Sequence, residues 1–400
     1  MNRWATRALG TIVAAAVVVT IAAGAPASAS TAEPEASPSV RVVPADDTGI
    51  AAAAARLVAG LSLEQRAASV VMGHIPTTDD ATLRRYMEEN ALGGFILMGG
   101  NIPGSESSLR RLTAALTTDP ALPPLIAIDE EGGQVTRLPW DDFPAANTLK
   151  QEPAGAAADA YRARAALVQR AGVGVNFGIV ADVADGRSSF IYGRALGTSP
   201  DASAERVTAA IDGERGQALS TVKHFPGHGA AAGDSHQTIP ATGMSKKDWA
   251  ATDGVPFAAA IADGVPLVMF GHLRYTAVDD APASLSAEWH RIVRDELGFT
   301  GVTITDDLGM LQASGVRAYR DPVDNAVAAL KAGNDMVLAV MFTTAGSAAA
   351  LVDGIVAAVE DGELSQGRLD EAATRVAALR LELAAGGRGL VPCDDCEAAG

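Results

Sequence analysis

Lysine, aspartate and three of the six histidines in the 400-residue chain fall within 14 positions, from Lys223 to His236. The stretch begins KHFPGHG and ends DSH, with a run of small residues between them. Its glycines and Pro226 exclude a continuous helix, so the histidines do not lie at helical spacing on one face. We therefore expect a loop that holds several titratable groups, which is typical of a functional site.

This loop admits three kinds of chemistry. His224, His228 and His236 together with Asp234 would be enough ligands for a metal ion, although the compact helical spacing that usually fixes two imidazoles on one face is missing. His228 could equally be a structural residue, hydrogen-bonded within the loop. In the third interpretation Asp234 orients His236 and raises its basicity, and the pair carries protons near neutral pH. The carboxylate-imidazole pair explains the loop best and needs no metal or cofactor.

An acidic cluster follows another apolar run. Asp129, Glu130 and Glu131 come directly after LIAI, and Gly-Gly and Arg137 come next. Acidic residues often begin helices, so helix capping is one interpretation. Three successive acids followed by two glycines and an arginine favour the other interpretation, a site for a hydroxyl-rich ligand.

Two further carboxylates, Asp306 and Asp307, follow the run VTIT. Asp307 is the better candidate to cap the next helix. Asp306 lies nearer the apolar run and is our candidate nucleophile or base, because carboxylates are the usual nucleophiles for sugar carbons.

Short apolar runs alternate with longer helical patterns from about residue 51 onward. Eight runs read as buried strands: 69–72, 94–98, 125–129, 173–177, 219–223, 267–271, 302–306 and 336–340. The helical patterns cover 81–90, 107–117, 157–171, 202–212, 249–263, 286–297, 324–332, 347–361 and 366–384. Fully apolar strands that alternate with helices are typical of a parallel sheet covered by helices.

Eight such repeats predict one α/β domain, a closed (β/α)8 TIM-type barrel that allows for local strand irregularity, over residues 51–386. A doubly wound open sheet is the alternative. Active sites of barrels lie at the carboxyl ends of the strands. Asp129, Lys223 and Asp306 are the last residues of predicted strands, His272 directly follows one, and Asp182 lies somewhat further from its own. We expect these polar groups to converge on one rim.

The ends of the chain have a different character. Arg3 and Arg7 precede an apolar run, and Ala27-Ser28-Ala29 has the form of a signal-peptidase site, so residues 1–29 are predicted to be a secretory signal. An uncleaved anchor is the alternative. Residues 30–50 read as a flexible linker and 387–400 as a tail. Cys393 and Cys396 in this tail could form a disulfide, and a catalytic redox pair is less expected because no βαβ context surrounds them.

The charge balance limits the partners. The formal net charge is −17 and becomes −19 without the two arginines of the signal, because that segment has no other charged residue. Such a chain offers no phosphate-binding surface, so we expect no nucleic-acid partner. We also expect no membrane span after signal cleavage, and a monomer that is secreted or associated with the cell wall.

Seven strings, spread over about residues 52–385, resemble glycoside hydrolase family 3, specifically its β-N-acetylhexosaminidase branch. They are GGFILMGGNI (93–102), IDEEGGQVTRL (128–138), GRALGTSP (193–200), KHFPGHGAAAGDSHQTIP (223–240), PASLS (282–286), LGFTGVTITDDLGM (297–310) and AGNDMVL (332–338). They run in the family's order, which makes the resemblance specific. The small residues before Asp234 depart from the family, where polar residues are more familiar.

The resemblance implies a retaining hydrolase that removes terminal β-linked N-acetylglucosamine from peptidoglycan fragments or chitooligosaccharides. Asp306 would form a covalent glycosyl-enzyme, and His236 paired with Asp234 would act as acid and base. The resemblance further implies that five residues bind the sugar: Asp129, Arg137, Arg194, Lys223 and His224. Two alternatives stay open, a β-N-acetylglucosaminide phosphorylase with the same pair and a sugar-binding barrel without catalysis.

Overall fold

The computed structural model describes residues 47–184 and 186–386, which lie within one compact unit, Ala45–Gly400. The predicted signal peptide, residues 30–46 of the linker, and the tail with Cys393 and Cys396 lie outside the described residues, so these predictions stay as they are. In the described part, no helix is both long and apolar enough to cross a membrane.

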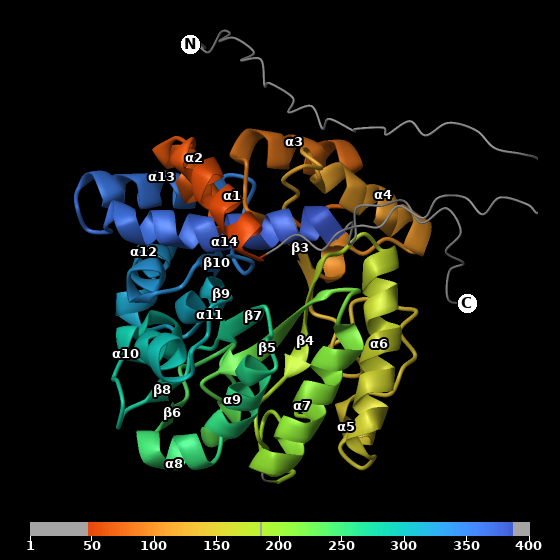
Figure 1. The fold of residues 1–400 in the computed structure, drawn as a ribbon. Coiled ribbons are helices and arrows are strands. Elements are labelled where there is room, and N and C mark those ends of the chain that lie inside the picture. Colours follow the sequence, from red (N-terminus) through yellow and green to blue (C-terminus); the bar gives the residue numbers. More distant parts are fainter. Residues whose placement is uncertain (1–46, 185, 387–400) are drawn as a thin grey trace, which may run out of the picture. The chain divides into compact units, whose positions relative to one another are not determined.

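Eight parallel strands close into a barrel (Figure 1), in the order β1-β10-β9-β7-β5-β4-β3-β2. The strands are β1 (Val71–Gly73), β2 (Gly94–Leu97), β3 (Leu125–Ile128), β4 (Val175–Val180), β5 (Leu219–Phe225), β7 (Leu267–Phe270), β9 (Val302–Asp307) and β10 (Met336–Leu338). Each one overlaps a predicted strand. The closed (β/α)8 barrel is therefore confirmed, and the open doubly wound sheet is wrong.

Helices pack around this barrel. They are α1 (Asp47–Ala59), α2 (Leu63–Ser69), α3 (Asp80–Asn90), α4 (Glu106–Leu116), α6 (Ala154–Arg170), α7 (Pro200–Glu214), α9 (Gly254–Ala262), α12 (Pro322–Ala332), α13 (Ser347–Glu360) and α14 (Gln366–Gly386). Their starts follow local rules. Pro200 and Pro322 occupy first-turn positions behind the capping side chains of Ser199 and Asp321, and Ser62 forms the capping box of α2 with Gln65.

The structure departs from the predicted elements in several places. The predicted helix 249–263 is split into α8 (Lys246–Ala251) and α9, with Thr252 at the break. The predicted helix 286–297 is a short α10 (Ala287–Arg291) that continues as one π-helical segment, η4 (Ile292–Glu296). Several short elements were not predicted. Two are helices, α5 (Ala146–Leu149) and α11 (Leu308–Ala313), and four are 3₁₀ turns, η1 (Gly99–Asn101), η2 (His228–Ala230), η3 (Ala283–Leu285) and η5 (Arg317–Tyr319). The last is a two-stranded sheet of β6 (Ala241–Thr242) and β8 (Arg274–Tyr275).

Alternation along the strands decides which side chains enter the barrel. On β3, Leu125 and Ala127 belong to the apolar cluster inside the barrel, whereas Ile126 and Ile128 pack in the cluster with the surrounding helices. Side chains two residues apart share a face, so this alternation directs the next residue, Asp129, inward. The same rule takes Val302 and Ile304 of β9 into the interior and directs Asp306 there.

Strand β5 departs from this alternation near its carboxyl end. The pairing of β5 with β7 shifts register between Val222 and Phe225, and both of these side chains pack outside the barrel. The two residues between them, Lys223 and His224, then both line the pocket at the barrel mouth. The expectation that the whole stretch from Lys223 is a loop is wrong, because Lys223 to Phe225 belong to the strand. The irregularity of the strand places two adjacent polar side chains in one site.

Candidate active site

A pocket of about 160 Å³ lies at the carboxyl ends of the barrel strands. Seven of the eight predicted site residues line it: Asp129, Arg137, Arg194, Lys223, His224, His236 and Asp306. The eighth, Asp234, contacts His236 from the same loop. Apolar side chains complete the wall, among them Met98, Met269, Met310 and Met341. The structure thus brings together residues from the ends of six strands and from the loops that follow β3, β4 and β5.

Asp306 is the pocket carboxylate with the fewest partners. Its Oδ1 accepts a hydrogen bond from the amide of Asp307 at 2.8 Å, and within the described chain no lysine or arginine pairs with it. Burial raises the pKa of Asp306. The nearby His224 and His272 imidazoles, the Asp307 amide and Lys223 together lower it by more, so its pKa lies below the usual value for an aspartate. Asp306 is therefore ionised at neutral pH and available to a ligand.

Asp307 has a structural role, as the sequence indicated. Its carboxylate accepts the amide of Gly309 at 3.0 Å and caps α11. It also accepts the amides of Val340 and Met341, both at 2.9 Å. Asp307 thereby fixes the segment after β10 that forms part of the pocket wall.

Ion pairs hold the two acids that follow β3, Asp129 and Glu131. Lys223 Nζ lies 2.7 Å from Asp129 Oδ1 and 2.8 Å from Glu131 Oε1. Arg194 makes a two-pronged contact with Glu131, at 2.9 and 2.7 Å, and Arg137 Nη2 lies 3.3 Å from Asp129. Burial raises the pKa of Asp129, but Lys223 and Arg137 lower it more, to about 2. Three cations thus face two paired carboxylates, and the third carboxylate, Asp306, balances the charge.

Glu131 belongs to the acidic cluster that the sequence analysis interpreted as a ligand site, but it was not assigned an individual role. Its Oε1 contacts both Lys223 and Arg194, so it sets the positions of two predicted sugar ligands. The signal was present in the sequence, because Glu131 lies two residues beyond Asp129 and so continues the inward face of β3.

His224 is held by Asp182, which follows β4. Asp182 Oδ2 lies 2.7 Å from His224 Nδ1, and its Oδ1 accepts the amides of His224 and His228. Burial and the nearby Arg194 lower the pKa of His224 well below its usual value. The neutral imidazole then donates from Nδ1 to Asp182 and accepts from Arg194 Nη2 at Nε2, at 3.3 Å. Asp182 was expected on this rim from the sequence, but it was not assigned a role in the site.

The predicted acid/base pair lies on the loop after β5. His236 Nδ1 is 2.7 Å from Asp234 Oδ1, which also accepts the His236 amide at 2.9 Å. The side chain of His236 is 54% exposed. Phe190, 40% exposed, lies edge-on to His236 with ring centroids 6.5 Å apart. The pairing leaves His236 Nε2 free of the carboxylate, so this nitrogen can exchange a proton at the pocket mouth.

His228 is buried beneath this pair. Its Nε2 lies 3.0 Å from Ser235 Oγ, and its ring packs against Phe190 at 5.2 Å. It does not line the pocket. The geometry is that of the hydrogen-bonded structural residue that the sequence analysis considered.

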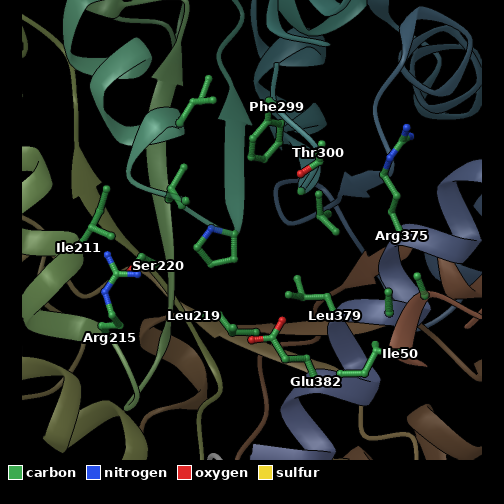
Figure 2. A pocket seen from close by; sticks show the side chains of 18 of the residues that line it. Ile50, Ile211, Arg215, Leu219, Ser220, Phe299, Thr300, Arg375, Leu379 and Glu382 are labelled. Atoms are coloured by element: carbon green, nitrogen blue, oxygen red, sulfur yellow. The ribbon is translucent and has the colours of Figure 1, made fainter. Parts of the chain in front are cut away.

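A larger hollow of about 570 Å³ lies at the other end of the barrel, where strands begin (Figure 2). It is lined by the starts of β5 and β9 and by α14, including Leu219, Val302 and Leu379. Its arginines are engaged in ion pairs, Arg215 with Asp212 and Asp263, and Arg375 with Asp335 and Glu371. In (β/α)8 barrels the active site lies at the carboxyl ends of the strands. The smaller pocket at that end is therefore the candidate active site, although this hollow is larger.

The pocket has an ionised carboxylate and an imidazole-carboxylate pair at the carboxyl end of a (β/α)8 barrel. This arrangement is suited to glycoside hydrolysis. The chain belongs to glycosyl hydrolase family 3, because residues 62–379 match the family described as "Glycosyl hydrolase family 3 N terminal domain". The resemblance seen in the sequence is thereby confirmed.

Individual relatives agree with this assignment. A protein named Beta-hexosaminidase from Alkalilimnicola ehrlichii is 37% identical over 282 residues, which cover 67% of this chain and 79% of that protein. A protein of Arthroderma benhamiae named "Uncharacterized secreted glycosyl hydrolase" is 32% identical over 84% of this chain and 98% of its own length. The structure of a family 3 β-N-acetylglucosaminidase from a Paenibacillus species superposes with a TM-score of 0.75 at 31% identity and covers 82% of this chain. This chain spans 63% of that protein.

Proposed function

We propose that the protein is an exported, retaining β-N-acetylhexosaminidase that releases terminal β-linked N-acetylglucosamine from peptidoglycan fragments or chitooligosaccharides. The observation that carries the proposal is the contrast among the pocket carboxylates. Asp129 and Glu131 are ion-paired, whereas Asp306 is ionised and available. Family membership and the relatives named β-hexosaminidases support the activity; the mechanism, the export and the substrate are the further parts of the proposal.

In the first step, an oxygen of Asp306 attacks the anomeric carbon while the bond from that carbon to the leaving oxygen breaks. His236, protonated at Nε2, gives its proton to the leaving oxygen, and Asp234 stabilises the imidazolium through Nδ1. The product is a glycosyl ester of Asp306. The alcohol departs from the exposed side of the pocket.

In the second step, neutral His236 takes a proton from water, the water oxygen attacks the anomeric carbon, and the ester bond to Asp306 breaks. Two inversions give overall retention. An imidazole suits this task here because a second unpaired carboxylate would add negative charge beside Asp306. Lys223, Arg194 and Arg137, set by Asp129 and Glu131, provide donors for the sugar hydroxyls and the N-acetyl group.

The product of the reaction tests the proposal. The purified protein, incubated with chitobiose and with an N-acetylglucosamine-containing muropeptide, should release free N-acetylglucosamine, whose first-formed anomer is β by proton NMR. Release should be unchanged when inorganic phosphate is added. A sugar 1-phosphate in place of the free sugar would make the protein a phosphorylase, and no turnover of any β-N-acetylglucosaminide would favour a sugar-binding barrel.

Export is tested separately. Expressed with its native amino terminus in a secreting bacterial host, the protein should be found outside the cytoplasm with Ser30 as its first residue, because the predicted cleavage follows Ala29. A protein that stays membrane-attached with residues 1–29 intact would show an uncleaved anchor.

A further inference from the structure

The proposed acid/base pair lies on the loop 226–240, which joins β5 to β6. The tip of this loop is open to solvent, since His236, Gln237 and Thr238 are all exposed. Asp234 forms hydrogen bonds with these same three residues, and therefore with the tip itself. The position of the pair relative to the pocket thus depends on what holds the rest of the loop to the barrel.

Two aromatic side chains hold the start of the loop. The hydroxyl of Tyr275 on β8 donates to the Gly227 carbonyl at 2.6 Å, and Trp249 Nε1 on α8 donates to the Pro226 carbonyl at 2.7 Å. Both aromatic side chains are buried. Burial raises the pKa of Tyr275 well above its usual value, so its hydroxyl keeps the proton that it donates. Two successive carbonyl groups are therefore fixed by side chains from outside the loop.

Strand β8 also holds the end of the loop. It pairs with β6 so that Ala241 lies opposite Arg274 and Thr242 opposite Tyr275. The Arg274 amide donates to the Pro240 carbonyl, the last of the loop, at 2.9 Å. Of the two aromatic residues, Tyr275 is the one whose own strand pairs with the end of the loop. It therefore links the two ends, one through its side chain and the other through its strand.

A short series of contacts leads from Tyr275 to His236. Gly227, which accepts the Tyr275 hydroxyl, directly precedes His228 in the chain. The Nε2 atom of His228 lies 3.0 Å from Ser235 Oγ in the interior. Ser235 is itself buried and directly precedes His236. A shift of Gly227 would therefore move the contact that holds the residue next to His236.

We propose that Tyr275 is a positioning residue for proton transfer: its hydroxyl fixes the start of the loop 226–240 and thereby keeps His236 at the pocket mouth. The inference rests on the proposed function, which gives His236 the role of general acid. Without the hydroxyl, the Gly227 carbonyl loses its buried donor and the start of the loop can shift. His236 then spends less time within reach of the leaving oxygen. Binding of the sugar changes little, because the proposed sugar ligands lie outside the loop.

Tyr275→Phe tests the proposal, because it removes only the hydroxyl. For the methyl β-N-acetylglucosaminide, whose leaving group needs a proton, kcat/KM should fall about fivefold, as expected for the loss of one hydrogen bond. For the nitrophenyl glycoside, which needs little protonation, it should change by less than about twofold. The inhibition constant for N-acetylglucosamine should stay within about twofold of the wild-type value, since the sugar ligands are unchanged. This last measurement also shows that the variant is folded around its pocket.

Tyr161→Phe is the matched control. The Tyr161 hydroxyl also belongs to a buried phenol that donates to a glycine carbonyl, that of Gly178 on β4, at 3.0 Å. The two variants therefore lose the same kind of hydrogen bond, and both should unfold at a lower temperature than the wild type. Tyr161→Phe should leave the ratio of the two rates unchanged, because its bond does not lie on the loop 226–240.

A double-mutant cycle separates positioning from general loss of stability. In a His236→Ala background, Tyr275→Phe should have no further effect on the methyl glycoside, because the group that it positions is gone. An unchanged ratio of the two rates in Tyr275→Phe, or the same loss with and without His236, would overturn the inference and leave the proposed function standing. Absence of turnover in the wild type would overturn the proposed function and the inference with it.

Discussion

The carboxylates of the site differ in their hydrogen-bond and ion-pair partners. Asp129 and Glu131 are neutralised by cations, Asp182 and Asp234 each hold an imidazole, and only Asp306 keeps its charge available to a ligand. Burial would favour the neutral form of each acid, so the local partners decide the outcome. Roles at this scale follow from contacts and not from residue type.

His236→Ala tests the acid role at the same scale. For kcat/KM, which reports formation of the glycosyl-enzyme, we expect a loss of about 100-fold or more with a poor leaving group such as methanol, because general acid catalysis is typically worth 10²–10⁴-fold. With a nitrophenolate leaving group, which needs little protonation, the loss should be below about tenfold. Equal losses for the two substrates would contradict a general-acid role. Asp234→Asn should show the same trend with a smaller amplitude.

At the scale of elements, two-residue alternation along the strands explains much of the site. It directs Asp129 and Asp306 inward from sequence alone, and it would also have found Glu131. It fails at β5, where the register shift between Val222 and Phe225 turns Lys223 and His224 to the same pocket. No local signal in the sequence reports such a shift, because it depends on pairing with β7, more than 40 residues later in the chain.

The loop between β4 and α7 contributes Phe190, whose ring contacts His228 and His236 on the loop of the proposed acid/base pair. Phe190→Ala should lower kcat/KM for the methyl glycoside by about 2- to 10-fold, since aromatic contacts of this kind are worth about 0.5–1.5 kcal/mol. The nitrophenyl substrate should be affected less. Phe342→Ala, which removes another exposed phenylalanine, is the matched control and should not change the ratio of the two rates. A Phe190 variant with an unchanged ratio would show that the contact does not support His236.

At the scale of the whole molecule, the eight strand-helix repeats were sufficient to predict the barrel and the end that carries the chemistry. The buried polar layer between barrel and helices was not predictable, because it depends on which helix side chain meets which strand. Arg164, Glu214 and Asn176 form part of this layer. Their sequence spacing gives no indication of their contact. The monomeric state and the absence of nucleic-acid partners stay predictions.

This buried layer makes stability depend on pH. Burial raises the pKa of Glu214 to about 7 from 4.5, so the folded protein keeps a proton that the unfolded chain has released between these values. Stability should therefore fall as pH rises from about 4.5 to 7. The Glu214→Gln side chain cannot ionise, so the variant does not lose this stability. The difference in unfolding free energy between variant and wild type should therefore favour the variant by about 3 kcal/mol more at pH 8 than at pH 4.5. Urea unfolding at both pH values measures this free-energy difference, and Glu360→Gln, a change at an exposed residue, is the control. An equal difference at the two pH values would contradict the prediction.

The most direct test of the account is the turnover of an aryl β-N-acetylglucosaminide by Asp306→Ala, with and without azide. Without azide, kcat should fall by at least about 10⁴-fold, because the covalent step is lost. Azide fits the space of the missing carboxylate, and it should restore release of the aryl group and yield the α-glycosyl azide. A near-normal rate without azide would contradict the assignment of Asp306 as the nucleophile.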